Sequence, residues 1–178
     1  RTDPRFQAMS LEDREGLIRE VRALRTRASP EALFRSFASL GGERGWLVWN
    51  WAWALRGFLD RLLGGPGLRR GRRHPTELLP GEAVDFWRVE AVEPPRLLRL
   101  RAEMRLPGRA WLEWEAREAE GGSLLVQTAY FEPKGLTGFL YWWALYPIHR
   151  RIFSDLARAI VREAEAQAEA PPRGGGAG

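Results

Sequence analysis

Two periodicities divide the chain into strand-forming and helical segments. Between residues 82 and 132, apolar and polar side chains alternate with a period of two, which is typical of half-buried strands. Pro and Gly pairs interrupt this alternation and are typical of turns. We therefore predict four strands, at Glu82–Val92, Arg96–Arg105, Arg109–Arg117 and Leu124–Glu132. The short connections favour an antiparallel meander.

Helical patterns lie on both sides of this meander. After a strand predicted at Glu20–Ala28, Ser29-Pro30-Glu31 favours a helix start, because serine caps free N–H groups and proline suits the first turn. A second helix is predicted over Trp46–Leu63, with tryptophans at positions i, i+3 and i+7. A third is predicted over Leu136–Ala168, with an apolar stripe at helical spacing and a kink or a junction of two helices at Pro147.

The length of 178 residues predicts one folded domain with extensions at both ends. We expect an N-terminal extension with a short helix over residues 1–19, a folded domain over 20–168 and a disordered tail over 169–178. The sequence starts at Arg1 rather than Met, so we expect it to be a piece of a longer product.

Composition excludes several function classes. The chain has no Cys and two His, which excludes disulfides, cysteine nucleophiles and Cys- or His-rich metal sites. The net charge is +5, carried almost entirely by arginines that are scattered through every segment. The chain lacks a signal peptide and an apolar run of about 20 residues, so a cytoplasmic protein without a transmembrane segment is expected. Nucleic-acid binding is not expected, because the tryptophans fall on predicted core faces.

Several motifs resemble one branch of the START-like (SRPBCC) superfamily. They are Pro30-Glu-Ala-Leu-Phe, Gly45-Trp-Leu-Val-Trp-Asn-Trp, Leu55-Arg-Gly-Phe-Leu-Asp-Arg-Leu, Gly67-Leu-Arg-Arg-Gly-Arg-Arg, Val84-Asp-Phe-Trp-Arg-Val and Gln127-Thr-Ala-Tyr-Phe. They look like the uncharacterised domain found C-terminal to atypical NAD(P)-binding short-chain dehydrogenases. The resemblance implies an α+β helix-grip fold, in which a curved antiparallel sheet wraps a long C-terminal helix and leaves an apolar cavity. It implies no catalytic residues. The dinucleotide-binding half is absent here, and no cofactor is expected.

Aromatic and apolar side chains are the candidates for lining such a cavity. Nine tryptophans supply large, rigid apolar surfaces that suit a flat or greasy ligand, although core packing alone is the alternative. The predicted ligand-binding residues are Trp46, Trp49, Trp53, Trp87, Leu100, Met104, Trp114, Trp142, Leu145 and Tyr146.

A basic loop follows the second helix and could bind an anion. Its arginines, Arg69, Arg70, Arg72 and Arg73, could clamp a carboxylate or phosphate at the cavity mouth. The loop lacks the Lys-Ser/Thr of a P-loop and follows a helix rather than a strand. A solvated loop without a ligand is the alternative.

Asp85, Gln127 and His149 are the candidates for proton transfer, because each shares a predicted apolar face with hydrophobic neighbours. Asp85 is placed on the strand face of Trp87 and Val89. The alternative is that each faces water or satisfies a nearby polar group.

Three hypotheses follow from these candidates. The first is a non-catalytic module that binds an apolar small molecule. The second is a cyclase- or dehydratase-like enzyme. The third is an accessory domain that docks on an NAD(P)-binding dehydrogenase through the Trp46–Trp53 surface.

Overall fold

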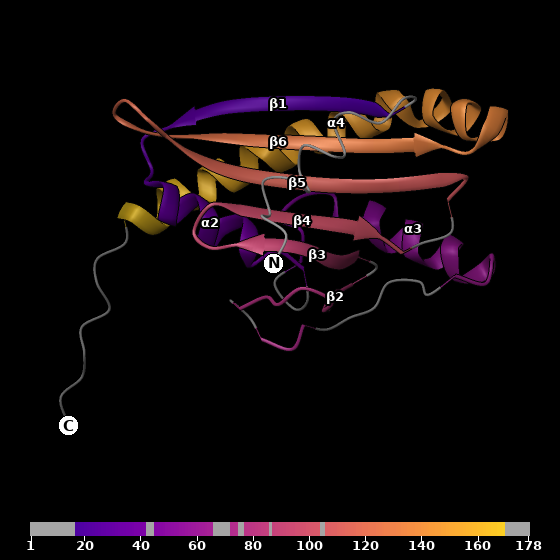
Figure 1. Ribbon diagram of the computed structural model, residues 1–178, viewed down its shortest axis with the longest axis horizontal. Helices are drawn as coiled ribbons and strands as arrows, with labels where there is room; N and C mark the ends of the chain where they lie inside the picture. Colours follow the sequence, from indigo (N-terminus) through magenta and orange to yellow (C-terminus); the bar gives the residue numbers. More distant parts are fainter. Residues whose placement is uncertain are drawn as a thin grey trace, which may run out of the picture.

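A six-stranded antiparallel sheet and three helices packed on one of its faces form two layers in the described part of the chain (Figure 1). The computed structural model describes residues 17–41, 45–65, 72–74, 77–85, 87–103 and 106–169. The elements are β1 (Ile18–Thr26), α2 (Pro30–Ala38), α3 (Asn50–Leu62), β2 (Ala83–Val84), β3 (Trp87–Glu93), β4 (Leu97–Ala102), β5 (Gly108–Ala119), β6 (Gly122–Pro133) and α4 (Gly135–Glu169). The predicted α+β class is confirmed.

The sheet has the strand order β1-β6-β5-β4-β3-β2, so the predicted meander is correct. Its first and last long strands, β1 and β6, lie side by side, from Ile18 opposite Phe131 to Thr26 opposite Ser123. The strand predicted at Glu82–Val92 is wrong as a single element. It is divided into β2 and β3, because Asp85 has a φ of 53° and turns the backbone out of the extended conformation.

Helix α2 begins where the sequence predicts. The Ser29 hydroxyl accepts a hydrogen bond from the Ala32 amide at 3.2 Å, and Pro30 occupies the first helical turn. Leu33 and Phe37 point into the core and are fully buried. Ring stacking between Phe37 and Trp114 of β5, with centroids 6.2 Å apart, fixes α2 against the sheet.

Helix α3 begins at Asn50, four residues after the predicted start at Trp46. Leu47 and Trp49 have φ values of 65° and 55°, so the preceding segment is left-handed at two positions and cannot be helical. The Asn50 side chain accepts a hydrogen bond from the Trp46 amide at 2.9 Å. Trp46 is nevertheless buried, because this turn directs it into the core.

The last helix, α4, crosses the same face of the sheet as α2 and α3 (Figure 1). Pro147 lies inside this single helix, so of the two predicted alternatives, a kink or a junction of two helices, the junction is wrong. Near its start, Gly138 packs against the loop before β5. A Cβ at this position would lie 2.5 Å from the Pro107 carbonyl oxygen, so glycine permits the close approach.

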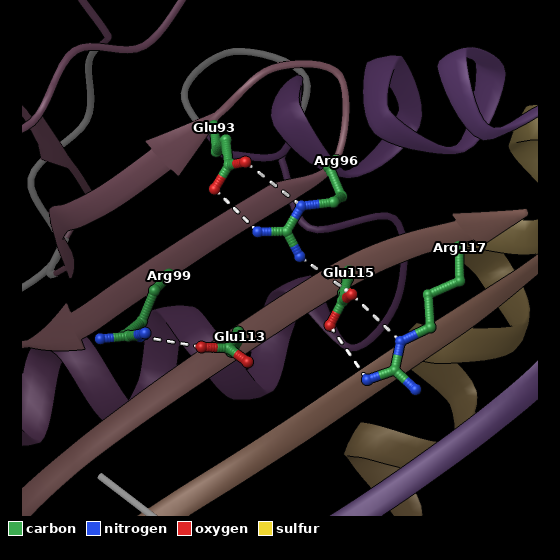
Figure 2. Close-up of polar contacts among 6 residues, drawn as sticks. All are labelled: Glu93, Arg96, Arg99, Glu113, Glu115 and Arg117. Carbon is green, nitrogen blue, oxygen red and sulfur yellow. Dashed lines mark hydrogen bonds and ion pairs between the residues drawn. The ribbon is translucent and has the colours of Figure 1, made fainter. Parts of the chain in front are cut away.

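The opposite face of the sheet carries buried and half-buried ion pairs (Figure 2). Arg99 of β4 is 0% exposed, and its Nε lies 2.8 Å from Glu113 Oε2 on β5. Beside them, Arg96 bridges Glu93 and Glu115 at 2.7 and 3.0 Å (Figure 2). These contacts tie β3, β4 and β5 together and leave the other face free for apolar packing.

The predicted helix before residue 18 and most of the predicted tail lie outside the described residues. Strand β1 begins at Ile18, two residues before the predicted start. In the described part of the chain, no helix combines the length and apolar character needed to cross a bilayer.

Candidate functional site

A cavity of about 280 Å³ lies between α3, the sheet and the first half of α4. Helix α3 contributes side chains between Trp51 and Leu59, and α4 contributes side chains between Tyr141 and Phe153. The floor comes from β3, β5 and β6, including Trp87, Ala110 and Ala129. The walls are almost entirely apolar, as is usual for a small-molecule site.

Small residues on the sheet explain why this end of the core is hollow. Ala110 and Ala129 line the cavity, and they leave space above the sheet. Further along β5, Leu112 and Trp114 fill the corresponding space, and both are completely buried. The sheet therefore packs tightly against α2 and leaves a pocket beneath α3 and the first half of α4.

Four side chains with an ionisable group line the cavity: Arg56 from α3, Tyr130 from β6, and Tyr141 and His149 from α4. The Arg56 guanidinium lies over the Tyr141 ring, 5.9 Å from its centroid, which is cation–π geometry. The Tyr141 and His149 rings are 6.5 Å apart. The Nδ1 atom of His149 is buried and has no hydrogen-bond partner among the described residues.

Burial changes the titration of two of these groups. Loss of water raises the pKa of Tyr141, and Arg56 partly opposes this shift. Burial, with a smaller contribution from the Arg56 cation, lowers the pKa of His149 to about 4. At neutral pH, His149 is therefore an uncharged imidazole beside a permanent cation.

The structure brings together four of the predicted ligand-binding residues, which are Trp53, Trp87, Trp142 and Leu145. Five others, namely Trp46, Trp49, Leu100, Trp114 and Tyr146, are not among the described residues that line the cavity. Leu100 and Trp114 belong to the filled core. Trp49 donates from Nε1 to Asp155 at 2.8 Å, and Tyr146 packs against the rings of Trp142 and Trp143. Met104 lies outside the described residues.

Asp85 is buried, being 4% exposed, but it lies in a turn rather than on the predicted strand face. Its Oδ2 accepts a hydrogen bond from Trp46 Nε1 at 2.8 Å. This bond fixes the segment before α3 against the start of β3. Asp85 is not among the described residues that line the cavity.

Gln127 is also buried and connects the sheet to α4. Its Oε1 accepts from Trp114 Nε1 at 2.8 Å, and its Nε2 donates to the Phe153 carbonyl at 2.9 Å. The amide is therefore engaged at both ends in structural contacts. His149 alone among the three proton-transfer candidates lines the cavity.

The predicted anion-binding loop is described only in part. Arg69 and Arg70 lie outside the described residues. Arg72 donates to the Leu40 carbonyl at 2.9 Å, and Arg73 pairs with Glu82. Neither is among the described residues that line the cavity.

Arg56 and Tyr141 line the cavity and were not predicted as site residues from the sequence. Both were detectable by helical spacing, because Arg56 follows Trp53 by three positions and Tyr141 precedes Leu145 by four. The basic loop carries more arginines and therefore attracted the anion-binding prediction. Only the tertiary packing of α3 and α4 brings Arg56 to the wall of an apolar cavity.

Large apolar side chains are exposed on α3 and α4, and four of them, Trp51, Leu55, Leu59 and Ile148, also line the cavity. Trp51 is 67% exposed on α3, and Trp143 is 64% exposed on α4. The other exposed apolar side chains on these helices, and directly after α3, are Leu55, Phe58, Leu59, Leu62, Leu63, Leu136, Phe139, Leu140 and Ile148. The predicted docking surface at Trp46–Trp53 is thus wrong in part, because Trp46 and Trp53 are buried. We call these exposed apolar side chains of α3, Leu63 and α4 the apolar rim.

The described residues contain no group of three or more His, Asp or Glu side chains placed to hold a metal ion.

The fold is similar to several solved structures. Ara h 8.0201 has a TM-score of 0.52 and 12% identity, covering 85% of this chain and 99% of its own. The Thalictrum flavum norcoclaurine synthase, solved as a point mutant with a transition state analogue, has a TM-score of 0.51 and 13% identity, covering 86% and 97%. These similarities confirm the predicted helix-grip fold.

The di-domain aromatase/cyclase StfQ of steffimycin biosynthesis has a TM-score of 0.52 and 12% identity, covering 92% of this chain and 55% of its own. The present chain therefore spans about half of that protein. No curated protein is significantly similar in sequence. A family model described as "Protein of unknown function (DUF2867)" matches residues 15–156.

Proposed function

Since this chain belongs to the DUF2867 family of proteins of unknown function, we propose from its geometry that it binds an apolar small molecule in the cavity between sheet and α4. The single observation that carries the proposal is the cavity itself, which is about 280 Å³ and lined by aromatic and aliphatic side chains. Transfer of an apolar ligand from water to such walls is favourable by about 25 cal/mol per Å² of buried apolar area.

The architecture supports this proposal in two further ways. Ala110 and Ala129 keep the floor of the cavity low, although larger side chains would fill the core and stabilise the fold. Trp51 and Leu55 of the apolar rim also line the cavity and are exposed, so apolar side chains connect the cavity with the surface.

Binding can be tested with N-phenyl-1-naphthylamine, a neutral apolar dye. The wild-type protein is expected to bind it saturably, with quenching of tryptophan fluorescence. Ala129→Phe fills the cavity floor and is expected to weaken binding at least tenfold. The matched control is Ala23→Phe, at an exposed position of β1. Absence of saturable quenching in the wild type, or equal binding by Ala129→Phe and the wild type, would contradict the proposal, provided that circular dichroism shows folded protein.

The enzymatic alternative rests on His149, because Asp85 and Gln127 make structural hydrogen bonds elsewhere. A neutral imidazole in an apolar cavity can accept or donate a proton. A change in the mass of a bound compound after incubation, absent in His149→Phe, would favour the enzymatic function over binding alone.

A docking function is the second alternative, and the apolar rim is the observation that favours it. Ten exposed large apolar side chains on α3 and α4, with Leu63 directly after α3, exceed what a surface without partners usually presents. The sequence resemblance suggests a dehydrogenase domain as the partner. Docking predicts that a separately expressed dehydrogenase domain co-elutes with this chain, and that Leu140→Glu abolishes co-elution without reducing dye binding. Unchanged co-elution of Leu140→Glu would contradict docking at the rim.

A further inference from the structure

We propose that the apolar rim binds the surface of a bilayer that contains anionic phospholipids. On that surface, α3 and the first half of α4 place apolar side chains among the acyl chains, and basic side chains at their borders contact the headgroups. This inference goes beyond ligand binding and does not depend on whether the cavity is occupied.

The outward face of the first half of α4 is apolar over about three turns. Leu136, Leu140, Trp143 and Pro147 follow one another at spacings of three and four residues, and all four are exposed. The inward face is apolar as well, and its Trp142 is buried. A helix that is apolar on all sides is usually surrounded by apolar material, whereas the outward face of α4 meets water.

Helix α3 adds a second exposed apolar face. Its members Trp51, Leu55, Phe58 and Leu62 also follow spacings of three and four residues. Leu55 and Ile148 of α4 are exposed and line the same cavity, so the exposed faces of both helices border it. Each face carries one exposed tryptophan, a residue that is enriched at membrane–water interfaces.

The charges around this surface are basic. Between residues 133 and 154, the sequence holds no Asp or Glu. The one acid of α3, Asp60, is 1% exposed. Exposed basic side chains lie at the borders of the apolar rim, namely Arg61, Lys134, Arg150 and Arg151. An apolar surface bordered by cations is typical of helices that lie on anionic membranes.

A basic groove continues from the apolar face of α4, which it shares at Pro147. The groove is lined by Pro147, Arg150, Arg151, Ser154 and Arg158. Asp155 Oδ2 lies 3.5 Å from Arg151 Nε, and Asp155 Oδ1 lies 3.9 Å from Arg158 Nη1. This one carboxylate balances at most one of the three guanidinium charges. Because arginine binds phosphate oxygens well, the groove fits a phospholipid headgroup whose acyl chains contact the apolar face.

The same charges argue against a second copy of this chain as the partner. Two copies that pack through the apolar rim would bring the arginines of α3 and α4 close to their counterparts, because an isologous interface uses the same patch twice. Like charges placed together in an interface are unfavourable. A different protein would need an acidic border around an apolar centre, whereas a bilayer with anionic lipid provides both.

Co-sedimentation with vesicles tests the proposal, using phosphatidylcholine alone and phosphatidylcholine with about 30% phosphatidylglycerol. Wild type is expected to bind the mixed vesicles at least tenfold more tightly than phosphatidylcholine alone. Leu140→Glu places a charge in the apolar rim and is expected to weaken binding to the mixed vesicles at least tenfold. Leu136→Glu, at a 74% exposed position, is a second variant with the same expectation.

The matched control for these variants is Val21→Glu, which is expected to bind within twofold of wild type. Val21 is a 48% exposed apolar residue of β1. The next residue, Arg22, donates to the Arg150 carbonyl of α4, so Val21 points to the opposite face of the sheet.

A second pair of variants tests the headgroup contacts. Arg150→Gln/Arg151→Gln is expected to reduce the preference for mixed vesicles at least fivefold. Arg25→Gln/Arg27→Gln, which changes two exposed arginines at the end of β1 and directly after it, is the matched control and is expected to retain the preference.

Absence of vesicle binding by folded wild type would overturn the proposal, as would equal binding to the two kinds of vesicle or unchanged binding by Leu140→Glu and Leu136→Glu. A dimer, or a complex with a dehydrogenase domain, that Leu140→Glu dissociates in a protein that binds no vesicles would assign the apolar rim to that partner instead. The neutral dye reports on the cavity and the vesicles report on the apolar rim, so failure of the binding function and failure of this proposal are distinguishable.

Discussion

Replacing Arg99 with methionine is expected to lower the free energy of unfolding by about 3–5 kcal/mol, measured by urea denaturation. Arg99 is fully buried, and its Nε is 2.8 Å from Glu113 Oε2. Its Nη1 also lies 3.5 Å from Glu90 Oε1. Removing the cation leaves the Glu113 carboxylate buried without this partner, and the cost of that desolvated charge dominates the expected loss.

Two further variants separate this cause from a general effect of losing arginine. Arg117→Met removes a 55% exposed side chain paired with Glu115, and it is expected to cost no more than about 1 kcal/mol. The double variant Arg99→Met/Glu113→Leu removes both charges and is expected to recover at least about 2 kcal/mol of the loss. A loss below about 1 kcal/mol in Arg99→Met would show that the ion pair is not important for stability.

Acidification is expected to destabilise the protein through His149. Its pKa is 6.5 without perturbation and about 4 in the folded protein, because burial and the Arg56 cation disfavour the imidazolium. Between these values, the unfolded chain binds a proton that the folded protein does not. The free energy of unfolding therefore falls by about 2–3 kcal/mol as the pH decreases from about 6.5 to about 4. Above pH 6.5, the contribution of the neutral His149 to stability is retained.

The variant His149→Phe should remove this contribution, because phenylalanine does not titrate. Urea denaturation at several pH values would then show a smaller decrease in stability for His149→Phe than for wild type. His74→Gln, at the only other histidine, is the matched control and should retain the wild-type decrease. Equal pH dependence for wild type and His149→Phe would contradict a buried, neutral His149.

The local pattern of apolar and polar residues was sufficient to predict those elements whose conformation depends on residues close together in the sequence. The alternation of apolar and polar residues over Arg109–Arg117 and Leu124–Glu132 predicted β5 and β6. It did so because successive side chains of any strand point to opposite faces of the sheet. Ser29 and Pro30 likewise predicted the start of α2. The same reasoning failed at Trp46 and Asp85, where left-handed residues interrupt apolar patterns that are otherwise regular.

Burial of the polar candidates was predictable, but their roles were not. Asp85 and Gln127 occupy buried positions, yet Asp85 accepts from Trp46 in the segment before α3, and Gln127 connects Trp114 on the neighbouring strand to the Phe153 carbonyl of α4. Spacing along the chain shows which face a side chain occupies and does not show which donor it meets across the core. For this reason the three candidates were indistinguishable until α4 was placed against the sheet.

The sequence by itself determined the class of fold, the antiparallel meander, the long final helix and the richness in aromatic surface, since these follow from local periodicity and composition. Only the tertiary structure decided which aromatic side chains pack the core, which line a cavity and which remain exposed on the apolar rim. It also brought Arg56 beside Tyr141, more than 80 positions apart in the sequence. The physical reason is that burial of an apolar face requires some partner, whereas the identity of that partner depends on how α3, α4 and the sheet fill space together.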